Sequence, residues 1–152
     1  TKADLFATIG PKGDGGIGLS GHSDCVPVEG QNWTSDPFAL TERDGKLYAR
    51  GSCDMKGFIA CALAAVPSFK ARALKEPIHI IVSYDEEVGC TGVRPLIARL
   101  GKALPRPRAV IVGEFIADAP DASGSIAFAS PKSNTFTVPS LRTLMFAGFR
   151  SR

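Results

Sequence analysis

Four short segments of the chain each carry a side chain that can bind a divalent metal ion, at the end of a strand or loop. They supply one imidazole and several carboxylates, and they span residues 20–24, 50–57, 84–89 and 112–114. Histidine nitrogens and shared carboxylate oxygens are the ligands with which proteins hold two divalent ions around one water. Their residue types and order therefore predict a two-metal hydrolytic centre.

His22 and Asp24 belong to the first segment. On an extended strand, side chains two residues apart leave from the same face. A neutral imidazole can bind zinc through one nitrogen while its other N–H donates to a carboxylate, and Asp24 could be that carboxylate. The alternative is a surface His-x-Asp pair that arose by chance, and the spacing alone leaves both interpretations open.

Asp54 belongs to the second segment and precedes the long helix expected from Met55. A carboxylate has two oxygens and can bridge two metal ions. An aspartate at this position can equally cap the amino end of a helix. The sequence leaves both interpretations open.

The acidic pair Glu86-Glu87 follows an apolar strand expected over residues 77–83. One glutamate could bind metal while the other takes a proton from water, and the spacing does not rank them. The alternative is an acidic first turn of a helix, favoured by the helix dipole. Glu114 similarly ends a strand over 109–112, at the carboxyl end where ligands collect in open α/β sheets.

The remaining histidine and the cysteines are expected to lie outside the site. His79 stands between isoleucines and is predicted to be a packed or edge residue, while Cys25 and Cys53 are expected to be small buried residues. The four cysteines show no Cys-x-x-Cys spacing, which argues against a zinc finger or a disulfide scaffold and favours a reducing cytoplasm.

Strands alternate with helices along the chain, which predicts an α/β layer fold. Strands are expected over 4–9, 18–21, 77–83 and 108–112, a hairpin over 38–50 turning at Asp44-Gly45, and helices over 55–74 and 91–100. Pro67 should kink or break the first helix. The residues of this helix predicted to form a buried stripe are Phe58, Ile59, Ala62, Leu63, Val66 and Phe69.

Composition limits the possible partners. With 152 residues and 44% hydrophobic residues the chain can form one domain, and a net charge of +3 does not indicate a nucleic-acid surface. The longest apolar run, 58–66, is too short to cross a bilayer.

Because the chain starts at Thr1, without methionine or a signal peptide, we expect it to begin inside a longer gene product. Residues 115–152 are rich in Ser, Ala, Pro and Phe and predict a poorly ordered tail.

Four stretches together resemble the acetylornithine deacetylase and succinyl-diaminopimelate desuccinylase family of di-zinc amide hydrolases, which includes aminoacylases and glutamate carboxypeptidases. They are residues 20–27, 33–38, 51–57 and 85–89. The likeness covers about residues 1–114 and is nearest to the acetylornithine deacetylase branch. It implies a three-layer, zinc-aminopeptidase-like α/β catalytic domain with a mixed sheet, incomplete here and without a lid domain.

The resemblance also implies metal ligands and an activity. His22 and Glu114 would hold one Zn²⁺, Asp54 would bridge two ions, and Glu87 would bind the second; Co²⁺ is possible. The reaction implied is hydrolysis of the amide bond of an N-acyl amino acid, N-acetylornithine in arginine biosynthesis, by a homodimer in the cytoplasm. No nucleic acid or membrane would be involved.

Two further residues receive roles through the resemblance. Glu86 would be the general base acting on the water, and Asp24 would orient His22. The family also has a cis peptide after the bridging aspartate, which here would be Asp54–Met55.

The chain departs from the family pattern at its end. The family continues with proline and threonine after Gly113-Glu114, whereas this chain continues with Phe115-Ile116-Ala117. The late histidine that completes the second zinc site is missing, because residues 115–152 contain no histidine. Two alternatives therefore stay open: a related dipeptidase or desuccinylase, and an inactive fragment that folds or binds one metal without turnover.

Overall fold

The computed structural model describes residues 1–113 and 135–136. Its elements are, in chain order, β1 (Leu5–Ile9), β2 (Ile17–His22), β3 (Thr41–Arg43), β4 (Lys46–Tyr48), η1 (Ser52–Lys56), α1 (Gly57–Lys70), β5 (Ile78–Ser83), α2 (Val93–Ile97), β6 (Ala109–Val112) and β7 (Thr135–Phe136). After the first four strands, helices and strands alternate from α1 to β6, as the sequence predicts. The fold class is therefore confirmed as α/β.

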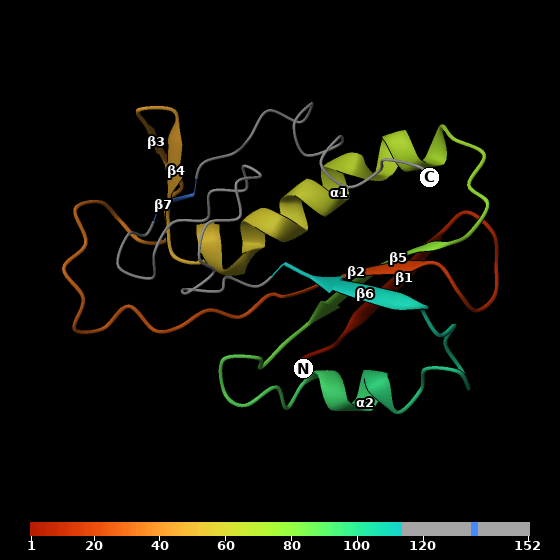
Figure 1. Ribbon diagram of the computed structural model, residues 1–152. Helices are drawn as coiled ribbons and strands as arrows, with labels where there is room; N and C mark the ends of the chain where they lie inside the picture. Colours follow the sequence, from red (N-terminus) through yellow and green to blue (C-terminus); the bar gives the residue numbers. More distant parts are fainter. Residues whose placement is uncertain (114–134, 137–152) are drawn as a thin grey trace, which may run out of the picture.

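A mixed four-stranded sheet forms the centre of the fold, in the order β1-β5-β2-β6. β2 pairs in parallel with both β5 and β6, while β1 runs antiparallel to β5. The register sets His22 beside Ser83 and Ser20 beside Val112. As a result, β2, β5 and β6 all end at one edge of the sheet, close to where α1 begins (Figure 1).

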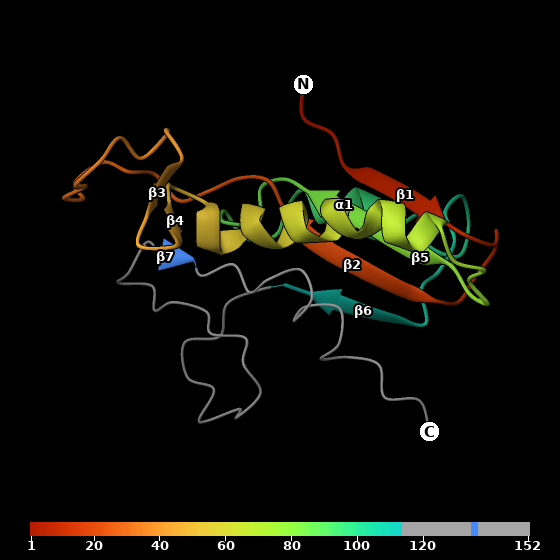
Figure 2. The same ribbon diagram turned by 90° about the horizontal axis from the view of Figure 1, so that it is seen from above.

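The two helices cover opposite faces of this sheet, which gives three layers (Figures 1 and 2). The apolar side chains of the core are Met55, Ala62, Ile80, Ile81 and Leu96. Two of these belong to β5, an interior strand between β1 and β2, which explains its nearly continuous apolar sequence.

Gly21 allows the amino end of α1 to lie close to β2. A Cβ at this position would lie only 2.9 Å from Ile59 Cγ1 and 3.0 Å from Met55 Cε. The absence of a side chain therefore allows the η1–α1 junction to pack against the last residues of β2. This contact places Asp54 next to the end of the strand that carries His22.

The β3–β4 hairpin forms as predicted. Asp44 and Gly45 both have positive φ angles, 54° and 68°, as a tight two-residue turn requires. β4 pairs further with β7, so residues 135–136 add a strand to this second sheet. The rest of the expected tail, and Glu114 with it, lies outside the described residues.

The helices differ from their predicted forms in three respects. α1 runs through Pro67 without a break and ends at Lys70. Leu63 is 52% exposed rather than buried, because it lies a 100° rotation from the buried Ala62 and so outside the strip that faces the sheet. α2 ends at Ile97 because the chain then turns tightly towards Gly101, whose φ is 71°. Within the described residues, no helix is long and apolar enough to cross a membrane.

Gly16, just before β2, should tolerate a side chain poorly. Its φ is 68°, and a Cβ would lie 1.8 Å from the carbonyl oxygen of Pro77. We expect Gly16→Ala to lower the free energy of unfolding by about 3 kcal/mol, since it adds a clash to a left-handed backbone. Urea denaturation measures the change. Gly30→Ala is the control, because Gly30 has a similar φ of 74° with nothing within 4 Å; an equal loss in both variants would contradict the clash.

Candidate metal centre

His22 is the last residue of β2 and its side chain is 1% exposed. Its Nδ1 donates to the main-chain carbonyl of Asp24 at 3.1 Å. This bond assigns the proton to Nδ1 and leaves Nε2 as the nitrogen that can bind a metal ion. Nε2 lies 3.1 Å from Asp54 Oδ1.

Asp54 lies in η1, where its backbone angles are not helical, and the Asp54–Met55 peptide is cis as the resemblance implies. The amino cap of α1 is Lys56, with no side-chain capping hydrogen bond. The helix-cap interpretation of Asp54 is therefore wrong. Its carboxylate instead faces His22, a residue 32 positions earlier in the chain.

Glu86 and Glu87 follow β5 at the same edge of the sheet. α2 begins only at Val93, so neither glutamate belongs to its first turn and that interpretation is also wrong. Glu87, His22 and Asp54 each offer one ligand atom, and these three atoms lie within 4.8 Å of one another. Glu86 stands beside this group, with Oε2 3.8 Å from His22 Nε2.

Asp24 connects the two loops that form the site. Its Oδ1 and Oδ2 accept hydrogen bonds from the backbone N–H groups of Glu86 (3.2 Å) and Glu87 (3.1 Å). Its carboxylate is 3.5 Å from His22 Nδ1, farther than its own carbonyl. Asp24 thus contacts His22 chiefly through its main-chain carbonyl rather than through the carboxylate that the sequence suggested, and its carboxylate holds the turn that carries Glu86 and Glu87.

The pKa values of two carboxyl groups reflect these surroundings. Burial alone would raise the pKa of Asp24, but hydrogen bonds from the backbone N–H groups of Glu86, Glu87 and Asp24 itself, together with the charge of His22, leave that pKa below its usual value. Burial raises the pKa of Glu87, and the negative charge of Asp54 raises it further. A cation among these side chains would relieve this repulsion. The imidazole and carboxylate donors therefore fit a divalent ion such as zinc.

Replacement of Asp24 tests its connecting role. Asp24→Asn loses the charge and turns an NH₂ group towards backbone donors, so we expect the free energy of unfolding to fall by about 2 kcal/mol. The affinity for Zn²⁺ should fall about 10- to 100-fold, as for other groups that orient ligands. Urea denaturation and zinc titration measure the two effects. Asp36→Asn is the control, because the Asp36 carboxylate accepts a hydrogen bond from the Phe38 N–H in an exposed loop; similar losses in both variants would argue against the connection.

The other sequence candidates lie apart from this group. His79 is 0% exposed and packed, with Nδ1 3.0 Å from Thr8 Oγ1 and Nε2 3.2 Å from the carbonyl oxygen of Gly15. Cys25 and Cys53 are half-buried rather than buried. Cys25 differs from the prediction because it borders an open hollow, where its sulfur accepts a hydrogen bond from Lys56 Nζ.

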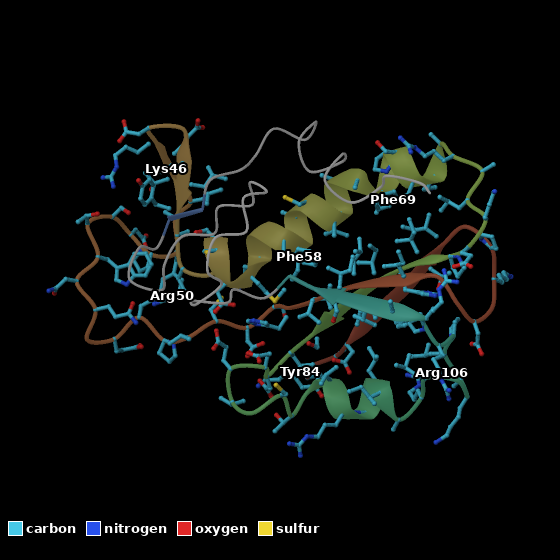
Figure 3. All side chains as sticks on the ribbon, in the orientation of Figure 1. Lys46, Arg50, Phe58, Phe69, Tyr84 and Arg106 are labelled. Carbon is cyan, nitrogen blue, oxygen red and sulfur yellow. The ribbon has the colours of Figure 1, made fainter. Side chains whose placement is uncertain are left out.

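The sequence did not predict the contact between Cys90 and Glu86. The thiol of Cys90 donates to Glu86 Oε1 at 3.3 Å. A four-residue separation after an acidic pair could have indicated this contact, but only if the intervening residues were known to turn. Tyr84, at the start of this loop, lies near the amino end of α2 in Figure 3.

Comparison with known proteins identifies the family. A family model described as peptidase family M20/M25/M40 matches residues 18–130, and the chain belongs to this family. The match continues past residue 114. An acetylornithine deacetylase of Myxococcus xanthus is 51% identical over 116 residues, and one of Shigella sonnei is 42% identical over 113 residues. Each comparison covers 74% of this chain but only 28% of the relative, so the chain spans little more than a quarter of the length of these proteins.

Solved structures agree with the fold. Human carnosine dipeptidase 1 superposes with a TM-score of 0.62 at 31% identity, over 72% of this chain and 24% of that protein. An M20 family metallo-carboxypeptidase of Sulfolobus solfataricus gives a TM-score of 0.63 at 24% identity, over 72% of this chain and 25% of that protein, and supports the fold alone. The mixed sheet and its helices are therefore those of M20 metallopeptidases.

Proposed function

We propose that this chain supplies part of a metal-dependent catalytic domain that hydrolyses the amide bond of an N-acyl amino acid. One observation carries the proposal: the donor atoms of His22, Asp54 and Glu87 lie within 4.8 Å of one another, with Glu86 beside them. We favour N-acetylornithine as the substrate, because the two acetylornithine deacetylases are 51% and 42% identical to the chain.

The residues divide between holding the metal and moving a proton. His22, Asp54 and Glu87 hold the metal, and we propose Glu114 as a further ligand. A divalent ion bound there would polarise the amide carbonyl and lower the pKa of a water. Glu86 takes the proton from the attacking water and gives it to the departing amine. Asp24 keeps Glu86 and Glu87 in place through their backbone N–H groups.

Further features are proposed for the complete enzyme. We infer two Zn²⁺ ions, with Co²⁺ as a possible substitute, and a second site that needs a histidine this chain lacks. We also propose a homodimer in the cytoplasm that acts in arginine biosynthesis.

Two alternatives have support of their own. Similarity to human carnosine dipeptidase 1 favours a dipeptide substrate. The three ligands that the described residues bring together are enough to hold one ion, so the second alternative is a chain that binds a single ion without turnover.

Metal content and substrate choice test the proposal together. The purified chain is loaded with Zn²⁺ and its metal content determined by mass spectrometry, while hydrolysis of N-acetylornithine, N-succinyl-diaminopimelate and a dipeptide is followed. Preferred hydrolysis of N-acetylornithine by the zinc-loaded chain supports the proposal, and about two zinc ions per chain would show that the second site forms without the late histidine. Preference for another amide assigns that substrate instead. At most about one zinc ion without turnover favours the inactive alternative.

A further inference from the structure

The turn between β5 and α2 has an unusual backbone for its composition. Asp85 and Cys90 have positive φ angles of 52° and 54°, and Gly89 has one of 97°. Residues other than glycine seldom adopt such angles, and asparagine or glycine would do so more easily than cysteine. Because unusual backbone conformations cluster at functional sites, a cysteine in this conformation beside a candidate active site points to a functional role for its side chain.

Glu86 is held from several sides within this turn. Its backbone N–H donates to Asp24, and its carbonyl accepts from the N–H groups of Gly89 (3.0 Å) and Cys90 (2.9 Å). The Thr91 N–H donates to the carbonyl of Asp85 at 3.0 Å and closes the turn. These bonds fix the main chain but leave the rotatable side chain of Glu86 to be positioned by another group.

The Cys90 thiol contacts one oxygen of that side chain. Sγ lies 3.3 Å from Glu86 Oε1, while the other oxygen, Oε2, lies 3.8 Å from His22 Nε2. Glu86, Cys90 and His22 also line a common hollow of about 220 Å³. The carboxylate therefore has one oxygen against the thiol and the other directed at the group of metal-binding side chains.

We propose that Cys90 is a positioning residue for Glu86. Its S–H donates to Oε1 and so selects the side-chain rotamer in which Oε2 faces the metal centre. The consequence for catalysis rests on the proposed function, in which Glu86 is the general base. A base acts efficiently only within hydrogen-bonding reach of its proton, so loss of the contact should slow the chemical step more than it weakens substrate binding.

The contact itself is tested in the full chain by infrared spectroscopy of the S–H stretching band. The difference between wild type and Cys90→Ser identifies the Cys90 band, and the same comparison for Cys61→Ser, on α1, serves as a control. We expect the Cys90 band to move to higher wavenumber in Glu86→Leu, which has no acceptor, and by a smaller amount in Glu86→Gln, which keeps a neutral one. A Cys90 band unchanged in both variants would overturn the proposal.

The effect on catalysis is tested with a matched pair of variants. Cys90→Ala and Cys90→Ser require the same left-handed backbone, but only serine can donate to Glu86. We expect Cys90→Ala to lower kcat about tenfold with KM nearly unchanged, and Cys90→Ser to restore most of the loss. Equal losses in both variants would reduce Cys90 to a structural residue and overturn the proposal. If no substrate is turned over, the proposed function fails, and the infrared bands still decide whether Cys90 holds Glu86.

Discussion

Asp54→Asn is expected to lose affinity for Zn²⁺ by more than about 100-fold, beyond what removal of an orienting group costs. The reason is that Asp54 contributes a charged oxygen close to both His22 and Glu87, within the 4.8 Å group of ligand atoms. Asparagine keeps the size of the side chain but offers a neutral oxygen, and a carboxylate can bind two ions where an amide does so poorly. Zinc titration against a competing chelator measures the change.

Asp44→Asn is the matched control for this variant. It makes the same chemical change in the hairpin turn, where asparagine tolerates the positive φ of 54°. Its zinc affinity should equal that of the wild type. If both variants bound zinc as tightly as the wild type, the ion would not lie between His22 and Asp54, and the proposed ligand set would be wrong.

Glu86→Gln should separate catalysis from metal binding. We expect kcat for the preferred N-acyl amino acid to fall about 10²- to 10⁴-fold, the range in which a general base contributes to catalysis. The affinity for Zn²⁺ should change little, because Glu86 is not part of the group formed by His22, Asp54 and Glu87. Steady-state kinetics and zinc titration on the same preparation measure both effects.

Glu87→Gln provides the reverse comparison. Its carboxylate belongs to the ligand group, so this variant should lose zinc affinity and activity together. If Glu86→Gln lost zinc while Glu87→Gln kept it, the roles of the two neighbouring glutamates would have to be exchanged. The pair thus settles an assignment that the spacing of the sequence leaves open.

Several parts of the fold could be predicted because they depend on local patterns. Alternating strands and helices predict the α/β layers, and Asp44-Gly45 predicts the hairpin turn that the structure contains. The gathering of His22, Asp54 and Glu87 could be expected from their positions at the ends of elements, since parallel strands end at one edge of a sheet. For Glu114 the expectation remains a prediction, as this residue lies outside the described part of the chain.

Other features depend on contacts that no local pattern encodes. The direction of Glu86 and Glu87 follows from a turn in which Asp85 has a positive φ of 52°, a conformation that no pattern in the neighbouring residues predicts. The carboxylate of Asp24 binds backbone groups 62 and 63 residues later, so its role depends on the pairing of β2 with β5. Leu63 fits the three- and four-residue spacing of the apolar residues in α1 but faces solvent, because this spacing does not give the width of the buried strip.

The link from Asp24 to the acidic turn also bears on the order of folding. The ligands come from the end of β2, from η1 and from the loop after β5, so the centre cannot form until β2 has paired with β5, as Ile17 does with Ile78. Contacts between residues so far apart in the sequence form late in folding, because closing the long loop between them costs conformational entropy. A bound ion would therefore lower the unfolding rate of the native domain and have little effect on its folding rate.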